Sequence, residues 1–169
     1  MELYLGCVYF DRSKGGPNRG AWATQVRREG KVLLVQWQRE EQITSNQAIL
    51  RAILLPLREL NSKGFGEEEV EIHTIYQYLY RGFTQWSGYW LENEFRSKVS
   101  GMPIRNRELW QEVLEQRHRL QFIYHPKGTH PIINKLIDFC WEKFDTNPVD
   151  VEADSGVPVW HPLVDHRLG

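Results

Sequence analysis

The sequence is poor in the features that mark several large classes of protein. Only two of its 169 residues are cysteines, Cys7 and Cys140, and they form neither a metal-binding pattern nor a disulfide framework, which favours a reducing compartment. No apolar run approaches the roughly 20 residues of a membrane helix. The start of the chain lacks the basic residues and the long apolar run of a secretion signal. We therefore expect an intracellular protein (cytoplasmic, organellar or viral) that is neither secreted nor bound to a membrane.

An excess of basic charge is also missing. The chain has 21 Lys and Arg against 22 Asp and Glu, for a net charge of −1. It therefore lacks the basic balance that is typical of nucleic-acid-binding domains. A local basic patch stays open, since five basic residues gather early in the chain: Arg12, Lys14, Arg19, Arg27 and Arg28. Aromatic side chains are plentiful, with seven each of Trp, Tyr and Phe, and such rings fill cores or stack on bases.

The hydrophobic pattern predicts alternating strands and helices. Strands are expected at 3–10, 21–30, 31–40, 70–74 and 121–124, and helices at 47–60, 76–90, 107–117 and 132–144. Thr44 or Ser45 is a candidate N-cap for the first helix, and Pro56 inside that helix should kink it or cost it a hydrogen bond. Helices that link strands imply crossover connections. We therefore expect an α/β fold in which helices pack on a mixed sheet.

Four segments closely resemble, in order, those of type 1 (bacterial-type) ribonuclease H: ITSNQAILRAIL, TIYQYLYRGFTQWSGYW, RNRELWQ and HPKGTHP. The spacing agrees from the first strand to NPVDVEADSG in the tail. The resemblance implies a ribonuclease H-like fold with a five-stranded mixed sheet in residues 1–146, followed by a tail at 147–169. It also implies an activity, the metal-dependent cleavage of the RNA strand of an RNA–DNA hybrid.

That activity uses four acidic residues, which hold two divalent ions about 4 Å apart. The resemblance places the first at Asp11 but the other three at Ile49, Ile75 and Ile137, and it places Lys127 where the family has a mobile histidine. Mg²⁺ needs oxygen ligands in near-octahedral geometry, so one aspartate cannot hold two ions and an isoleucine offers no ligand. We therefore expect no metal, no cofactor and no enzymatic activity, with the three isoleucines packed together as an apolar plug.

One alternative metal site stays open, built from Asp11, His73 and Asp138. His73 lies two residues before Ile75 and shares its face of the strand. Asp138 is turned about 100° away from position 137 on a helix, which counts against its joining the site. Mg²⁺ is expected as a cofactor only under this alternative.

The resemblance also implies residues that contact nucleic acid. The matching positions are Ser45, Asn46, Gln77, Trp86, Trp90, Arg96, Lys98 and Arg105. Helix capping explains Ser45 and Asn46 equally well, and Trp110 matches a core tryptophan of the family. The lysine- and arginine-rich segment of bacterial members is reduced here to LENEFRSKVSGMPIR. Because phosphate neutralisation drives much of the non-specific affinity, we expect weak hybrid binding.

Three hypotheses about function follow. The main one is a non-catalytic module that binds nucleic acid (RNA–DNA hybrid or structured RNA) or a partner protein as a scaffold, in a polymerase or ribonucleoprotein assembly. The first alternative is a divergent metal-dependent hybrid ribonuclease with a rebuilt active site. The second is a pure protein–protein adaptor that uses exposed aromatic residues of the tail, such as Trp160.

Overall fold

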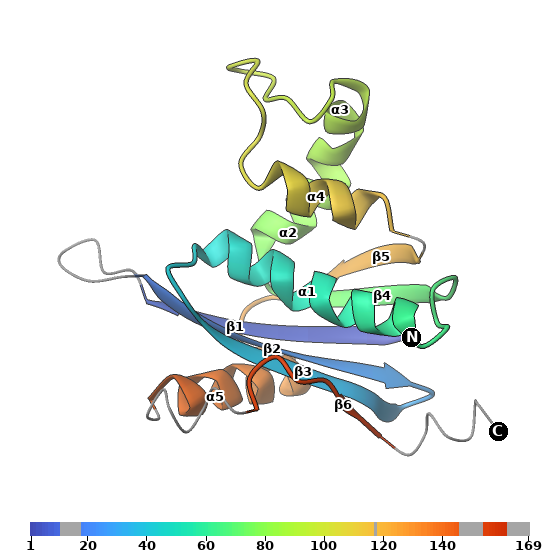
Figure 1. Ribbon diagram of the computed structural model, residues 1–169, viewed down its shortest axis with the longest axis vertical. Helices are drawn as coiled ribbons and strands as arrows, with labels where there is room; N and C mark the ends of the chain where they lie inside the picture. Colours follow the sequence, from blue (N-terminus) through green and yellow to red (C-terminus); the bar gives the residue numbers. More distant parts are fainter. Residues whose placement is uncertain (11–17, 117, 146–153, 162–169) are drawn as a thin grey trace.

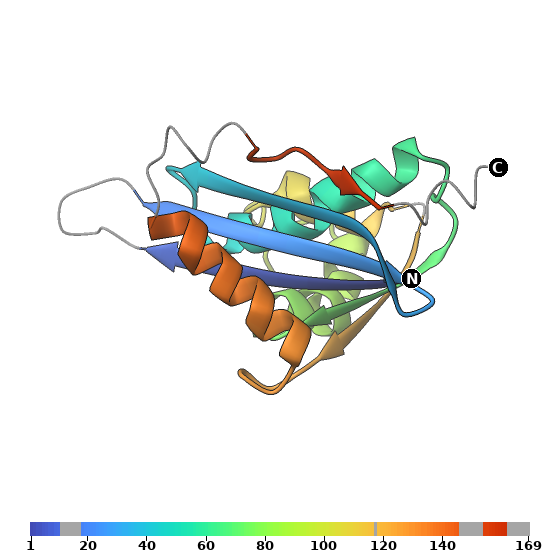
Figure 2. The same cartoon turned by 90° about the horizontal axis from the view of Figure 1, so that it is seen from below.

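The computed structural model describes residues 1–10, 18–116, 118–145 and 154–161. Its centre is a six-stranded mixed sheet with the strand order β5-β4-β1-β2-β3-β6. Helix α1 (Ser45–Ser62) covers one face and α5 (Pro131–Asp145) covers the other (Figures 1 and 2). The helices between β4 and β5 extend away from the sheet on the α1 side. This is the α/β architecture that the sequence predicted.

Three antiparallel strands form the first half of the sheet: β1 (Glu2–Phe10), β2 (Arg19–Arg28) and β3 (Lys31–Glu41). A two-residue turn at Glu29 and Gly30 joins β2 to β3, and both residues have positive φ angles of 53° and 76°. Two positive φ angles are typical of the type I′ turn, whose twist matches that of the flanking strands. The turn thus falls where the sequence predicted one strand to end and the next to begin.

The strands β4 (Glu69–Thr74) and β5 (Arg119–Tyr124) complete the central sheet in parallel orientation. β4 pairs with β5 along its whole length but with β1 only over residues 2–4 of β1. Parallel neighbours cannot be joined by a tight turn. Helix α1 accordingly connects β3 to β4, and three further helical elements and α4 connect β4 to β5.

Helix α1 begins with a capping box. Thr44 accepts a hydrogen bond from the Gln47 N–H at 3.1 Å, and the Gln47 side chain accepts one from the Thr44 N–H at 3.0 Å. The helix continues past Pro56, which has no N–H to donate to the carbonyl of Ala52 four residues earlier. The buried hydroxyl of Thr24 in β2 donates to that carbonyl instead. The predicted hydrogen-bond loss is thus compensated from the sheet.

The segment between β4 and α4 (Arg107–Leu114) is helical but not one regular helix. The sequence predicted a single helix at 76–90. The structure instead has α2 (Gln77–Arg81), the π-helical turn η1 (Gly82–Trp86) and α3 (Ser87–Glu92). A π-helical turn bonds each residue to one five positions away, so it changes the face on which the following residues lie.

A sixth strand comes from the tail, where the sequence predicted none. β6 (Val159–Trp160) pairs antiparallel with β3. Trp160 packs against Phe65, with ring centroids 6.2 Å apart and planes 16° apart, so it is not the exposed aromatic that the adaptor hypothesis requires. The described part of the tail, 154–161, therefore belongs to the sheet, while the boundary at 146/147 stays a prediction.

The sheet separates two hydrophobic cores. The larger lies under α1 and includes the fully buried Trp22 and Trp110; the smaller lies under α5 and includes Tyr4 and Ile133. Within the described ranges, no helix is long and apolar enough to cross a membrane.

Candidate catalytic edge and nucleic-acid interface

The positions that match the family's carboxylates come from three elements. Ile75 directly follows β4, Ile49 lies in α1 and Ile137 lies in α5, while Asp11 lies outside the described residues. Lys127 is exposed in the loop between β5 and α5. Ile49 belongs to the core under α1, whereas Ile75 and Ile137 pack against the core under α5. The predicted plug of three isoleucines is therefore wrong, because Ile49 packs in a different core from the other two.

A phenol next to Ile75 joins the end of β4 to β1. β1 and β4 are paired in register only as far as Tyr4 and His73. Beyond that point, the hydroxyl of Tyr76 accepts a hydrogen bond from the Cys7 N–H at 2.6 Å and donates one to the Cys7 carbonyl at 3.0 Å. Burial raises the pKa of Tyr76, so the group is uncharged. An uncharged bridge thus lies beside a position where the family has an anionic ligand.

These residues do not fit a pair of carboxylate-held divalent ions. Hydrocarbon side chains stand at three of the four positions. Asp138 is exposed on α5 and joins no group of potential ligands with His73, so the site of Asp11, His73 and Asp138 is not assembled among the described residues. In that part of the chain, the one group of three or more potential ligands is His73, His125 and His130. Imidazole nitrogen suits transition metals rather than Mg²⁺.

His73 was a candidate ligand from the sequence, whereas His125 and His130 were not. Both missed residues stand beside prolines in HPKGTHP, a segment that was used only to place Lys127. Their closeness to His73 follows from the pairing of β4 with β5, which the sequence does not show. The His125 N–H donates to the Thr74 carbonyl at 2.8 Å, and this brings HPKGTHP beside the end of β4.

Polar side chains gather at the starts of α1 and α2. Because Thr44 is the N-cap, the capping explanation for Ser45 and Asn46 is wrong, and both side chains are partly exposed. Gln77 is exposed, and its Nε2 donates to the Tyr124 hydroxyl at 3.4 Å. α1 and α2 contact each other, so the three polar residues lie on neighbouring helices. They stay candidates for hybrid contacts.

The tryptophans of the projecting segment divide between surface and core. Trp86 is 39% exposed, whereas Trp90 is 9% exposed and packs on the fully buried Trp110 with ring centroids 5.1 Å apart. Trp90 therefore offers little surface for a contact with nucleic acid, which stays a prediction, and the prediction that Trp110 lies in the core is confirmed. The rings of Trp86 and Trp90 are neighbours, with centroids 6.0 Å apart, so the difference in exposure comes from the packing of Trp90 on Trp110.

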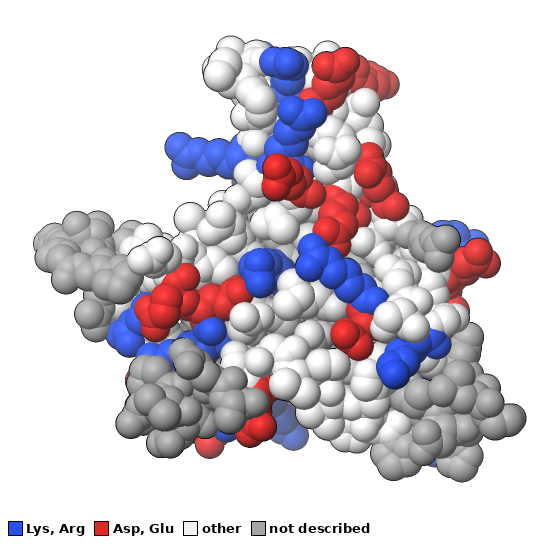
Figure 3. Space-filling view, in the orientation of Figure 1, with Lys and Arg blue, Asp and Glu red and all other residues white. Residues whose placement is uncertain are grey.

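The remaining basic residues of the loop after α3 are exposed. Arg96 donates to the Gly101 carbonyl at 3.2 Å, Lys98 lies 5.8 Å from the ring centroid of Tyr89, and Arg105 is exposed before α4. In the view of Figure 3 this projecting part carries side chains of both signs rather than one basic face. A mixed surface of this kind favours weak, salt-sensitive contact with phosphate.

The early basic residues do not form one patch. Arg12 and Lys14 lie outside the described residues. Arg19 and Arg28 are the first and last residues of β2, so they lie at opposite ends of that strand. Arg28 is also paired with Glu68 at 2.8 Å.

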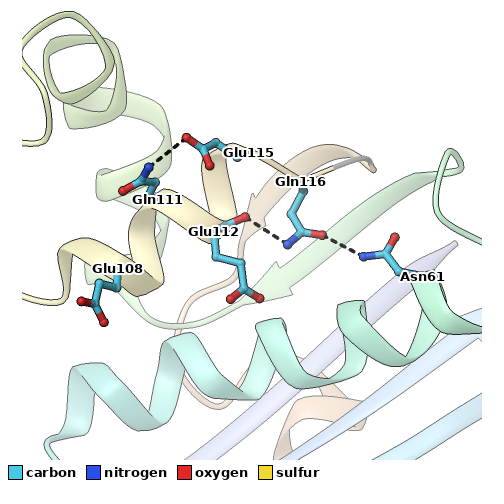
Figure 4. A pocket seen from close by; sticks show the side chains of 6 residues that line it. All are labelled: Asn61, Glu108, Gln111, Glu112, Glu115 and Gln116. Carbon is cyan, nitrogen blue, oxygen red and sulfur yellow. Dashed lines mark hydrogen bonds between the residues drawn. The ribbon is translucent and has the colours of Figure 1, made fainter.

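A pocket between α1 and α4 is acidic. Its lining residues are Asn61, Glu108, Gln111, Glu112, Glu115 and Gln116. Figure 4 shows that Asn61 donates to Gln116, which in turn donates to the backbone carbonyl of Glu112, with distances of 3.5 and 3.0 Å. Glu112 is paired with Arg58 at 2.6 Å, and the other carboxylates would repel phosphate, so this pocket does not favour nucleic acid.

Comparisons with known proteins agree with this fold. The family model described as RNase H matches residues 6–140. The ribonuclease H of Neorickettsia sennetsu (strain ATCC VR-367 / Miyayama) is 27% identical over 141 residues, which cover 82% of this chain and 89% of the relative.

Two solved structures are similar in fold. The first is LC9-RNase H1, a type 1 RNase H with the type 2 active-site motif, at 17% identity and a TM-score of 0.70, covering 99% of this chain and 80% of the other. The second is LC11-RNase H1 in complex with an RNA/DNA hybrid, at 18% identity and a TM-score of 0.59, covering 86% of this chain and 99% of the other.

These findings correct the expectation that the chain is not an enzyme. That expectation rested on the isoleucines alone, whereas the relatives are named ribonuclease H and the matching family is one of enzymes. The match begins within β1, runs through α1 and β5 and ends within α5, and it leaves out β6. This chain belongs to the ribonuclease H family.

Proposed function

We propose that this chain binds RNA–DNA hybrids and cleaves their RNA strand, as a divergent ribonuclease whose catalytic groups differ from the four-carboxylate set. The observation that carries the proposal is the family match over residues 6–140. Further support comes from the fold shared with LC11-RNase H1, whose structure contains an RNA/DNA hybrid. Because Ile49, Ile75 and Ile137 offer no metal ligands, catalysis must use other groups.

The proposed hybrid-binding surface runs from the starts of α1 and α2 to the loop after α3. Ser45, Asn46 and Gln77 offer hydrogen bonds, and the exposed ring of Trp86 offers a stacking surface. Basic charge is supplied by Arg96, Lys98 and Arg105. Three phosphate contacts give a slope of roughly −3 for log K against log salt concentration, so binding should be strong only at low salt.

Fluorescence anisotropy with a labelled hybrid at low and moderate salt tests the binding half. Trp86→Ala should weaken binding about tenfold, since stacking of one base is worth roughly 1–3 kcal/mol. Trp141→Ala is the matched control, because Trp141 is 45% exposed but lies on α5, on the opposite face of the sheet. Equal losses in both variants, or no binding at low salt, would contradict this surface.

A cleavage assay with Mg²⁺ or Mn²⁺ and an end-labelled hybrid tests the catalytic half. Asp11 is the one family carboxylate that the sequence keeps, so Asp11→Asn should abolish intrinsic cleavage and leave binding intact. Contaminating host ribonuclease H would be unaffected by that change. A preparation that binds hybrid but does not cleave it, or cleaves it equally well as Asp11→Asn, would refute the catalytic half and leave the binding half standing.

A further inference from the structure

Three histidines meet where β4, β5 and α5 come together. His73 lies in β4, His125 directly follows β5 and His130 directly precedes α5. Figure 2 shows the start of α5 beside the ends of both strands. One ligand atom from each residue lies within 4.8 Å of the other two. The three residues, here called the histidine cluster, are partly buried and therefore accessible to a small ion.

His73 and His125 share a hydrogen bond between ring nitrogens. Nδ1 of His73 is 2.8 Å from Nε2 of His125. The ring planes differ by only 16° and the centroids are 5.1 Å apart. The N–H bond and the lone pair of an imidazole lie in the plane of its ring, so this hydrogen bond between nearly parallel rings sets them edge to edge rather than face to face. Both nitrogens thus point at one shared proton, and a metal ion can take the place of that proton.

His130 approaches this pair from the third side. Its ring centroid is 4.7 Å from that of His125 and 6.0 Å from that of His73. The Ile132 N–H donates to its Nδ1 at 3.2 Å, at the long end of the hydrogen-bond range. A neutral imidazole has one lone-pair nitrogen. His130 can therefore bind a metal through Nδ1 by giving up this long bond, or through Nε2 after its proton moves to Nδ1.

The surroundings favour neutral rings and leave one nitrogen without a partner. Tyr4 stacks on His73 with ring centroids 4.5 Å apart. Burial, followed by the charge of His125, lowers the pKa of His73 to about 4, and burial also lowers the pKa of His130. Neutral imidazole is the form that binds metals. Nε2 of His73 is buried and has no hydrogen-bond partner in the described part of the chain.

We propose that the histidine cluster binds one divalent transition-metal ion of the zinc class, through one nitrogen of each ring. Three imidazoles without a carboxylate suit Zn²⁺, Cu²⁺ or Ni²⁺ rather than Mg²⁺ or Ca²⁺. Zn–N bonds of about 2.0–2.1 Å set tetrahedral ligand nitrogens roughly 3.3 Å apart, so His73 and His125 must separate by about half an ångström and turn so that both lone pairs point at the ion. Three protein ligands leave a fourth position open to an external ligand. The proposal does not rest on the proposed function, because it concerns the protein without nucleic acid.

Metal titration of the full chain tests the proposal. After removal of bound metal, calorimetry with Zn²⁺ should give one ion per chain, and Co²⁺ should give the visible absorption of a tetrahedral site. Loss of a second-shell partner typically weakens metal binding about 10–100-fold, so loss of a ligand in His125→Gln or His130→Asn should cost at least that much. His161→Gln is the matched control outside the cluster. Mg²⁺ at the same concentration should not compete.

His130→Asn is chosen because Asn is a good N-cap and preserves the start of α5. If the variants fail to fold, imidazole ¹⁵N shifts of the unmodified protein decide the question. Zn²⁺ should then shift the ring nitrogens of His73, His125 and His130 and leave those of His118 in place. Equal affinity in all variants, no saturable binding, or shifts confined to other histidines would each overturn the proposal.

Discussion

Gly82, at the start of the π-helical turn, tests the packing of the projecting helices most directly. A Cβ at this position would lie 2.2 Å from Cη2 and 2.4 Å from Cζ2 of Trp110. Trp110 has little room to move, since it is fully buried, packs on Trp90 and donates its Nε1–H to the Tyr78 hydroxyl at 2.7 Å. The change Gly82→Ala must therefore displace either a large ring or the helix itself.

Two effects oppose each other in this variant. Alanine favours a helix over glycine by roughly 0.5–1 kcal/mol. Overpacking of a core costs about 1–3 kcal/mol, and the overlap here involves two atoms of a rigid ring, so the upper end applies. The net loss in free energy of unfolding should be about 2 kcal/mol. With an m-value of about 2 kcal/mol/M, the urea midpoint should fall by about 1 M.

Gly88→Ala is the matched control in the same segment. Gly88 is exposed in α3, and a Cβ there meets nothing within 4 Å, so this variant should gain about 0.5–1 kcal/mol. Urea unfolding followed by tryptophan fluorescence and circular dichroism measures both changes. If Gly82→Ala is as stable as the unmodified protein, or gains stability as Gly88→Ala does, a Cβ at this position does not clash with Trp110.

Three further outcomes can be measured by urea unfolding. Thr44→Ala removes the hydroxyl of the capping box and should lower stability by about 1 kcal/mol, whereas an unchanged midpoint would show that the cap contributes nothing. Trp90→Ala should cost about 3–5 kcal/mol because the ring is buried, while the exposed Trp86→Ala should cost much less; equal costs would contradict the assignment of Trp90 to the core. Burial lowers the pKa of His118 below its ordinary 6.5, so the unfolded chain takes up a proton at higher pH than the folded chain does. Stability should therefore fall as the pH drops below about 6.5, and His118→Gln should flatten that part of the profile.

Local features of the fold were predictable from the sequence. Thr44 carried the chemistry of an N-cap, with Gln47 three residues later, and the structure has the cap there. Glu29 and Gly30 form the turn between β2 and β3, where the sequence predicted the boundary between two strands. Each of these depends on neighbours within a few residues, which is the range over which sequence patterns are informative.

Features that depend on distant residues could not be predicted. The hydroxyl of Thr24 replaces the donor that Pro56 lacks, but these residues are brought together only by packing of α1 on the sheet. The close fit of Gly82 against Trp110 and the burial of Trp90 on the same ring likewise depend on residues more than 15 positions away in the chain.

The candidate site was predictable only in part. The resemblance placed Ile75 and Ile137 near one edge, and both do pack in the core under α5. The histidine cluster needs the parallel pairing of β4 with β5 and the return of the chain into α5, which join residues up to 57 positions apart: His73 and His130. The alternation of residues along one strand indicates on which face of the sheet His73 lies, but it does not indicate which distant residues lie beside it.

The short strand β6 has a consequence for how copies of this chain behave toward one another. An edge strand with unpaired N–H and C=O groups is a template for another chain. β3 (Lys31–Glu41) would be such an edge without β6. The tail pairs with part of β3 through Val159 and Trp160. The N–H groups of His161 and Gly156 also donate to the carbonyls of Leu33 and Trp37, at 3.0 and 2.6 Å, so the tail occupies more of this edge than the two paired residues. Residues 154–161 thus hinder the pairing of β3 with the edge strand of another copy of the chain. This effect bears on aggregation at high protein concentration and is separate from any active site.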